Sequence, residues 1–402
     1  MATENKKYIP TLRFTEFQND GEWKADTMET IFDIKNGYTP SKSNSLFWDN
    51  GTIPWFRMED IRKNGHILSD SIQHITPAAV KNAGLFPAYS IIVATTATIG
   101  EHALIIVDSL ANQQFTFLTK RKSFDNKLDM MYFHYFMFII DEWCKRNTNA
   151  GGLLSVNMDS FKKLTIPYPS SLSEQKKIAD CFVSIDKEID ATKRKLELLK
   201  EHKKGLMQRL FPAKGKTTPE LRFPEFQNDG EWIPRPLSDI LNYEQPTPYI
   251  VEDDTYKKEG TPVLTANKGF ILGYTDESFG IYNKLPVIIF DDFTTDKKYV
   301  DFSFKIKSSA MKLLTLKDEE RDNLRFIFEC MSNIVFEEKE HKRYYISEYQ
   351  HINIYVPSSL QEQNQIADTL LSIDKQISEY DKKIKALELH KKGLMQQLFP
   401  KL

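Results

Sequence analysis

The chain is poor in cysteine and has no long apolar run, and each shortage excludes a class of protein. Its three cysteines, Cys144, Cys181 and Cys330, lie far apart without a CxxC pair, so we expect neither a disulfide framework nor a thiolate zinc site. The apolar runs, such as residues 136–140, are too short to span a bilayer, and the polar segment 1–10 does not resemble a signal peptide. The expected location is therefore the cytoplasm.

Strong charge of one sign is also lacking, since the formal net charge is −2. This value argues against a protein coated in basic surface. Any contact with nucleic acid must then come from local patches.

Catalytic motifs are missing as well. The sequence contains no GxGxxG, HExxH or GxSxG, and Lys216-Thr217 lacks the upstream glycine of a phosphate loop because Leu210 stands there. We therefore predict no catalytic residue, no metal site and no cofactor in this chain. Asp291 and Asp292 have no partnering Glu or His at an ordered spacing, which favours a structural turn. The absence of these motifs does not exclude a metal nuclease whose ligands are dispersed along the sequence.

An internal repeat is the main positive signal in the 402 residues, which suffice for two or three domains. Residues 10–23 return as residues 219–232 with 12 of 14 positions identical, and residues 169–212 return as residues 357–400 with 26 of 44 identical. The inserts between these frames, 24–168 and 233–356, show no comparable likeness. The order is frame, insert and helix, twice, which suggests two equivalently held modules that bind different things.

The repeated segment after each insert predicts a long helix with a heptad seam. Each begins with helix-start residues and ends at Phe-Pro, and apolar residues recur at two seam positions. We expect the two helices to pair as an antiparallel intramolecular coiled coil with a pseudo-two-fold axis. The predicted helix–helix seam consists of Ile178, Phe182, Ile185, Ile189, Leu196, Leu199, Ile366, Leu370, Ile373, Ile377, Ile384 and Leu387.

Such a helix of about 57 Å, at roughly 1.5 Å per residue, exceeds one DNA turn of roughly 34 Å. It could hold two readers over separated stretches of one duplex. The alternative is an ordinary structural or oligomerising coiled coil, in which Lys203 and Lys391 in the seam would be weak spots or register devices.

The first insert reads as a mixed α+β module with polar, basic loops, and the second interleaves basic residues with tyrosines, which fits contact with phosphates and bases. Arg and Lys suit guanine edges or phosphates, Asn and Gln suit adenine, and Ser and Thr suit either, although any solvated loop has a similar composition. The candidate DNA-binding residues are Tyr38, Thr39, Ser41, Lys42, Arg57, Lys63, Thr96, Thr98, Gln113, Gln114 and Asn149 in the first insert, and Tyr249, Asn267, Lys268, Thr294, Thr295, Lys297, Lys298, Arg343 and Tyr344 in the second.

The whole pattern resembles the specificity subunits of Type I restriction-modification enzymes. The duplication, the Ser-Ile-Asp-Lys segments and residues 360–367 carry the resemblance, and residues 287–296, 307–311 and 37–41 with 53–55 resemble parts of the family's target-recognition domains. The resemblance implies an α+β chain with two such domains separated by the two helices. The expected divisions are 1–168 and 213–356 for the target-recognition domains, and 169–212 and 357–402 for the spacer helices.

The same resemblance implies a function without catalysis. Each domain would read one half of a bipartite DNA target, and the paired helices would set the gap between the halves. Expected partners are double-stranded DNA, two methylation subunits that carry S-adenosylmethionine, and motor-nuclease subunits that use ATP and magnesium. The rival from another class is a coiled-coil adaptor that tethers two protein-binding domains without DNA.

Overall fold

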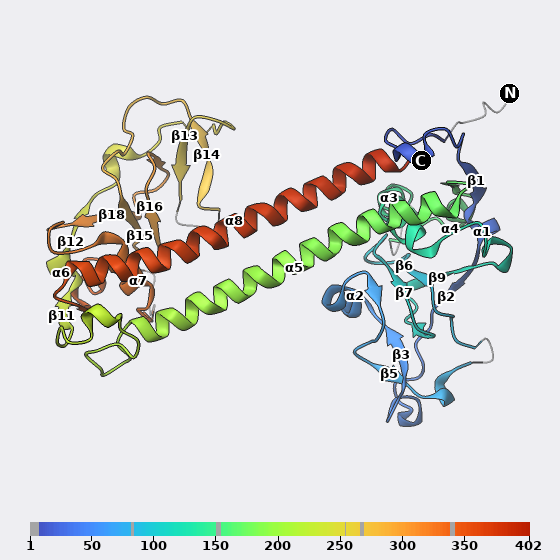
Figure 1. The fold of residues 1–402 in the computed structure, drawn as a ribbon, viewed down its shortest axis with the longest axis horizontal. Helices are drawn as coiled ribbons and strands as arrows, with labels where there is room; N and C mark the ends of the chain where they lie inside the picture. Colours follow the sequence, from blue (N-terminus) through green and yellow to red (C-terminus); the bar gives the residue numbers. More distant parts are fainter. Residues whose placement is uncertain (1–7, 82–83, 150–153, 254, 266–268, 338–341) are drawn as a thin grey trace. The chain divides into compact units, whose positions relative to one another are not determined.

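A computed structural model describes residues 8–81, 84–149, 154–253, 255–265, 269–337 and 342–402. The chain forms two compact units (Figure 1). The first unit combines residues 1–192 with 383–402, and the second consists of residues 193–382. Each unit joins one insert to parts of both long helices. The α+β class is confirmed, whereas the predicted four-part division of the chain stays a prediction.

The first unit is built on one five-stranded sheet and two smaller ones. In the large sheet the order is β2-β9-β6-β7-β4, the three-stranded sheet has the order β5-β3-β8, and β1 pairs with β10. The strands are β1 Lys24–Thr27, β2 Phe32–Asn36, β3 Ile53–Phe56, β4 Ile67–Leu68, β5 His74–Ile75, β6 Ser90–Ala94, β7 His102–Ile105, β8 Leu110–Ala111, β9 Phe115–Lys120 and β10 Thr165–Tyr168.

Helix α3, Met130–Arg146, covers the large sheet against β7. It begins where the Asp129 side chain accepts a hydrogen bond of 2.8 Å from the Tyr132 amide, which satisfies one of the free N–H groups of the first turn. Its apolar side chains form one core with β6, β9 and the ends of the long helices. Short helices complete the unit: α1 Met28–Ile31, α2 Met58–Asn64 and α4 Met158–Lys162.

The second unit has a four-stranded sheet, β12-β18-β15-β16, a three-stranded sheet, β14-β13-β17, and the pair β11 and β19. Helix α7, Leu324–Ser332, covers the large sheet and is capped by Asn323, while α6 spans Leu237–Ile240. The strands are β11 Ile233–Pro236, β12 Leu241–Glu244, β13 Thr261–Leu264, β14 Ile271–Thr275, β15 Val287–Asp291, β16 Lys297–Val300, β17 Lys305–Ile306, β18 Met311–Leu316 and β19 Asn353–Val356.

The two inserts share one topology although their sequences are unlike, except that β4 adds a fifth strand to the large sheet of the first. The order β2-β9-β6-β7 corresponds to β12-β18-β15-β16, and β5-β3-β8 corresponds to β14-β13-β17. Even the strand directions agree, because β3 runs parallel to β8 and β13 runs parallel to β17. The repeat in the sequence is thus a repeat of whole folds, and the inserts differ in side chains more than in architecture.

The long helices are α5, Leu172–Leu210, and α8, Leu360–Leu398 (Figure 1). In the first unit Asp186 pairs with Lys391 and Glu188 pairs with Lys383, both at 2.6 Å, so the residue number rises on one helix as it falls on the other. In the second unit Lys203 pairs with Asp374 at 2.7 Å. The predicted antiparallel pairing of the two helices is therefore confirmed.

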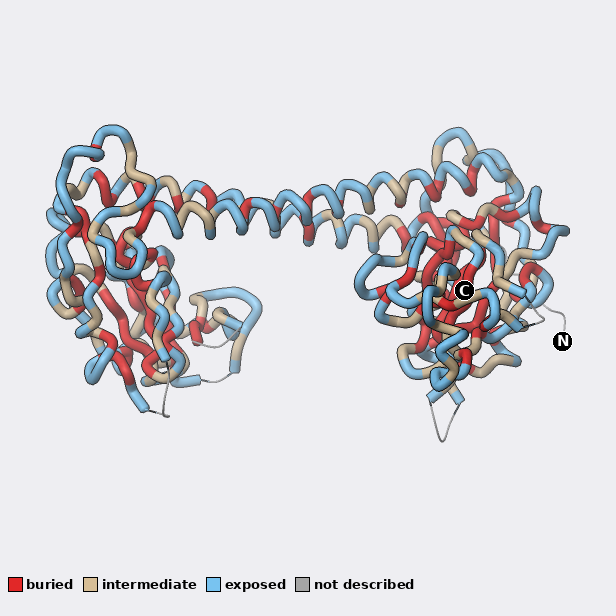
Figure 2. Tube along the Cα trace, turned by 90° about the horizontal axis from the view of Figure 1, so that it is seen from below, coloured by how far each residue is buried: buried red, intermediate tan, exposed pale blue. Residues whose placement is uncertain are grey.

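Buried positions recur along both helices (Figure 2). They coincide with the predicted seam, whose residues are all buried apart from three that are half-buried: Ile185, Ile377 and Leu387. Thr192, which also lies in the seam, is 4% exposed and donates its hydroxyl to the Glu188 carbonyl at 2.6 Å. The helix therefore satisfies this polar seam residue internally.

The repeated frames make the same contact twice. In the first unit both carboxylate oxygens of Glu174 accept hydrogen bonds from Arg13, each at 2.7 Å, and Trp23 donates to the same carboxylate at 3.3 Å. In the second unit Arg222 and Trp232 bind Glu362 in the same way, at 2.8, 2.7 and 3.3 Å. This buried contact joins each frame to the start of its long helix, which explains why both segments are repeated together.

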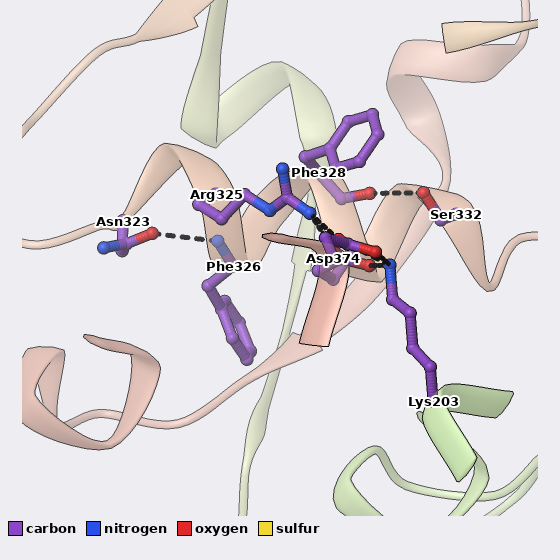
Figure 3. Close-up of polar contacts among 8 residues, drawn as sticks. Lys203, Asn323, Arg325, Phe326, Phe328, Ser332 and Asp374 are labelled. Atoms are coloured by element: carbon purple, nitrogen blue, oxygen red, sulfur yellow. Dashed lines mark hydrogen bonds and ion pairs between the residues drawn. The ribbon is translucent and has the colours of Figure 1, made fainter. Parts of the chain in front are cut away.

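The seam lysines are paired in the same symmetrical manner. Asp186 and Asp374 occupy equal positions in the two helices, and so do Lys391 and Lys203, so the two ion pairs are equivalents. Figure 3 shows the second-unit pair, where Arg325 of α7 also binds Asp374. A lysine that finds its partner at one register of the other helix disfavours a slipped register. The structure thus favours the register role over the weak-spot role.

Replacing Asp374 with alanine should lower the free energy of unfolding of the second unit by about 2 kcal/mol. Lys203 and Arg325 are only 19% and 13% exposed, so each loses a partner in a poorly solvated place, while Glu329 remains beside both. Urea denaturation would measure the loss. Asp381→Ala, an exposed substitution on the same helix, is the control and should change stability by less than about 0.5 kcal/mol. Equal losses in the two variants would contradict the register role.

Candidate nucleic-acid interface

Three loops of the first unit meet at one end of its large sheet. They are the β6–β7 turn, the β8–β9 loop and the segment after α3. Thr95 ties them together, because its amide donates to the Gln114 carbonyl at 3.1 Å and its carbonyl accepts from the Val156 amide at 2.9 Å. Thr96 forms a further bridge to Ser155. The loops are therefore fixed relative to one another by main-chain hydrogen bonds.

A polar cleft of about 380 Å³ lies between these loops. Three candidate residues line it, Thr96, Gln113 and Asn149, and the Thr39 hydroxyl donates to the Gln113 side chain. The other residues around it carry hydroxyls or amides at Asn36, Thr95, Ser155 and Asn157, and the remaining three are Val156, Met158 and Asp159. Hydroxyls and amides both donate and accept hydrogen bonds, as reading of base edges requires.

Tyr38 has mainly a structural role. Its hydroxyl donates to the Ala79 carbonyl at 3.1 Å and accepts from the Lys81 amide at 2.9 Å, while the Lys81 ammonium lies 4.4 Å from the ring centre. The preceding Gly37 must lack a side chain, because a Cβ there would lie 2.4 Å from the Ala111 carbonyl oxygen. This close approach holds the segment after β2 against β8.

The other candidates of the first insert are spread over its surface. Ser41, Lys42 and Lys63 are exposed, and Thr98 and Gln114 are half-buried near the three loops. Arg57 is half-buried and its guanidinium binds Glu59 at 3.1 Å. Six of the eleven first-insert candidates thus lie at the three loops, and the other five lie elsewhere in the unit. The six are Thr39, Thr96, Thr98, Gln113, Gln114 and Asn149.

The second unit brings the equivalent three loops together. Asp292, at the position of Thr95, donates its amide to the Ala310 carbonyl at 2.9 Å and accepts from the Tyr344 amide at 2.8 Å. The β15–β16 turn, which carries Thr294 and Thr295, is therefore tied to the loop before β18 and to the segment that carries Arg343. Thr294, Lys298 and Arg343 are exposed on this side.

The acidic pair Asp291 and Asp292 stabilises this turn. An oxygen of Asp291 accepts the amides of Phe293 and Thr294 at 2.8 and 2.7 Å. Asp292 accepts the Tyr345 amide at 2.8 Å and pairs with Lys312 at 3.3 Å. These contacts are those of a structural turn, as the sequence indicated.

The remaining candidates of the second insert offer less surface. Thr295 and Tyr344 are 9% and 1% exposed, and Tyr249 is half-buried, where its hydroxyl donates to Glu244 at 2.6 Å and helps lower the pKa of that carboxyl. Lys297 donates to the Tyr349 hydroxyl at 3.2 Å, and burial lowers the pKa of its ammonium. Asn267 and Lys268 lie outside the described residues.

Sequence reasoning missed Asn36 and Lys312 at these loops. Asn36 ends β2 and lines the polar cleft. Its place directly before the loop that begins at Gly37 was a usable signal. Lys312 is only 1% exposed and lies inside β18, where no sequence pattern separates it from a surface lysine.

Comparison with known proteins finds one family that part of the chain resembles. Residues 20–201 match the family model described as the Type I restriction modification DNA specificity domain. The chain is 47% identical over 171 residues to the Type I restriction enzyme EcoprrI specificity subunit of Escherichia coli, a match covering 42% of each chain. The first part of the chain is therefore similar to the DNA specificity domain of the Type I restriction-modification specificity subunits.

A second relative is similar over a shorter stretch. The EcoR124I/EcoR124II specificity subunit of Escherichia coli is 48% identical over 146 residues, which are 34% of this chain and 36% of that relative. The matched part thus spans less than half the length of these specificity subunits.

Solved structures share the fold of the chain. The S subunit of the Type I restriction-modification system from M. genitalium superposes with a TM-score of 0.65 over 98% of this chain and 99% of that one, at 15% identity. A chain from a study of complex assembly and conformational transition of the type I R-M system gives a TM-score of 0.50 over 94% and 96%, at 13% identity. No helix among the described residues is long and apolar enough to cross a membrane.

Proposed function

We propose that this chain is the DNA-reading, non-catalytic subunit of a Type I restriction-modification complex, and that each unit reads one half of a bipartite target. One observation carries the proposal: both units present the same three-loop arrangement, tied by the same main-chain hydrogen bonds, with different side chains. A common scaffold with unlike polar loops is what two readers of different sequences require.

The loop chemistry supports groove reading. Around the first-unit cleft most side chains are neutral amides and hydroxyls, which bond base edges, and Asp159 adds one carboxylate, whereas the second unit exposes Lys298 of β16 and Arg343 beside Thr294. Exposed lysines such as Lys42 and Lys63 would bind phosphates and position the duplex. The near-neutral net charge is compatible with this, because a few local contacts suffice.

The reaction chemistry belongs to partner subunits in this proposal. Two methylation subunits would bring S-adenosylmethionine, and motor-nuclease subunits would use ATP and magnesium, while this chain supplies no cofactor and works in the cytoplasm. Its partners are thus double-stranded DNA and these subunits. The match of residues 20–201 to the family model and the shared fold support this division of labour.

Replacing the insert at residues 24–168 with the corresponding insert of another specificity subunit tests the proposal. We expect only one half of the methylated sequence to change, because each unit has its own loops and its own core. Methylome sequencing of cells that carry the chimaera with its methylation subunit would measure both halves. A change in both halves would refute modular reading.

Two further measurements separate the rival functions. DNA reading predicts a duplex shift that weakens steeply with salt, because bound lysines and arginines release counterions from the phosphates. A coiled-coil adaptor predicts capture of protein partners and no shift. The purified chain with magnesium and plasmid should leave the DNA uncut, and cleavage would instead favour a nuclease.

A further inference from the structure

A network of three polar side chains lies beneath the β6–β7 turn in the first unit and beneath the β15–β16 turn in the second. The two polar networks occupy equivalent positions. Strand pairing fixes the equivalence, since Ala94 faces Phe115 in the first unit and Asp291 faces Met311 in the second. Thr95 and Asp292 directly follow these strands and are therefore equivalent. On β9 and β18, Thr116 pairs with Val93 and Lys312 pairs with Phe290, so these two positions are equivalent as well.

In the first unit the polar network carries no charge. Thr116 donates to the side-chain oxygen of Asn36 at 2.9 Å, and the hydroxyls of Thr95 and Thr116 lie 3.0 Å apart. Because Thr116 has one hydroxyl proton and gives it to Asn36, Thr95 must donate to Thr116. Thr116 is fully buried, and Asn36 reaches the polar cleft.

In the second unit the same three positions are polar but two are charged. The Lys312 ammonium lies 3.0 Å from the side-chain oxygen of Gln245 and 3.3 Å from the Asp292 carboxylate. Lys312 and Asp292 are each 1% exposed, whereas Gln245 is exposed. Asn36 ends β2 and pairs with Thr116, while Gln245 follows β12, whose last residue, Glu244, pairs with Leu313 next to Lys312.

These buried polar groups are not explained by packing. Burying a hydroxyl or an ion pair is unfavourable unless its hydrogen bonds are made, and apolar residues of similar volume would fill the same space. Each polar network ends at the residue whose amide and carbonyl tie the three loops together, which is Thr95 in the first unit and Asp292 in the second. The polar network therefore holds the first residue of the turn through its side chain, while main-chain hydrogen bonds hold the same residue to the two other loops.

We propose that Asn36, Thr95 and Thr116 in the first unit, and Gln245, Asp292 and Lys312 in the second, set which bases each unit reads by positioning the turn above them. Thr116 and Lys312 are buried, so they act through the turn and not by touching DNA. The neutral network and the ionic network hold their turns differently. They therefore contribute to the difference between the two half-sites. This inference rests on the proposed DNA reading.

Selection from a randomised duplex library by the full chain tests the proposal. Thr116→Val keeps the shape of the side chain and removes the hydroxyl, so the preference for one or more bases in the first-unit half should relax by about tenfold, as loss of a hydrogen bond implies. Thr116→Ser keeps the hydroxyl and should retain the wild-type motif. The half read by the second unit should be unchanged in both variants.

The second unit provides an independent test with Lys312→Met combined with Asp292→Asn. This pair removes both charges together and keeps an oxygen at Asp292 that accepts the Tyr345 amide. Relaxed preference is then expected only in the second-unit half. If thermal melting shows that Thr116→Val does not fold, the second-unit variant tests the positioning role by itself.

The outcomes separate this inference from the proposed function. A folded variant that keeps the wild-type preference in its own half overturns the positioning role, and so does an equal loss in both halves. A wild-type chain that selects no motif contradicts the proposed function itself. Relaxation confined to the matching half, with rescue by serine, supports both.

Discussion

Replacing Glu362 with alanine is expected to lower the free energy of unfolding of the second unit by about 4 kcal/mol. Glu362 is fully buried and Arg222 is 10% exposed, so the variant leaves a guanidinium with little access to water. Arg222 would keep only its bond to the Gly230 carbonyl, and the Trp232 indole N–H would lose its acceptor. The frame would also lose its polar contact with the start of α8.

Glu174→Ala is the matched variant in the first unit and should cost about the same, because its contacts with Arg13 and Trp23 have the same geometry and Glu174 is 1% exposed. Glu379→Ala, an exposed change on α8, is the control and should alter stability by less than about 0.5 kcal/mol. Hydrogen exchange followed by mass spectrometry resolves the two units. A loss below about 1 kcal/mol in either buried variant would show that the ion pair is dispensable.

Lowering the pH from 7 to 5 is expected to destabilise the first unit by about 2 kcal/mol through His102 alone. Burial, and next the nearby His66, lower the pKa of His102 to about 3. In the unfolded chain the imidazole binds a proton near pH 6.5, whereas in the folded chain it stays neutral. Stability is therefore complete above pH 6.5 and falls as the pH drops toward 3.

His134 should add to this loss, because burial and the neighbouring His102 also lower its pKa well below the usual value. The two rings lie 5.4 Å apart on α3 and β7, and Lys391 also disfavours protonation of both. Charging either imidazole would place a cation in a poorly solvated cluster that contains Phe138.

His102→Gln should remove the acid sensitivity that His102 supplies. The second unit is an internal control, since the residue equivalent to His102 by strand pairing is Lys297, so no histidine stands at that position. Hydrogen exchange at pH 7 and pH 5, corrected for the intrinsic rates, would compare the units. Equal acid destabilisation of both units, or an unchanged response in His102→Gln, would contradict this account.

The helical part of the fold was predictable because its physics is local and periodic. Heptad spacing identified the seam from Ile178 onward, and the apolar residues at that spacing lie buried between α5 and α8 in each unit. The repeat also indicated two equivalent modules. The partners of Lys203 and Lys391 were not predictable, because an ion pair depends on the register between two segments far apart in the chain.

The candidate loops were only partly predictable from composition. Thr96, Gln113 and Asn149 were identified by residue type, and the structure brings them to one cleft. Tyr344 was identified by the same reasoning, yet it is buried and contacts the Phe336 ring at 5.1 Å. Residue type does not distinguish a tyrosine that faces solvent from one that fills a core.

The sequence by itself determined the duplicated frame, the two long helices, their apolar seam and the α+β class. These features depend on identity between segments and on spacing along one helix, both of which are visible in one dimension. Only the tertiary structure decided that the unlike inserts share one topology and that Thr95 and Asp292 hold equivalent places. Strand pairing joins residues far apart in the chain through main-chain groups that every residue carries, so unlike side chains can occupy the same architecture.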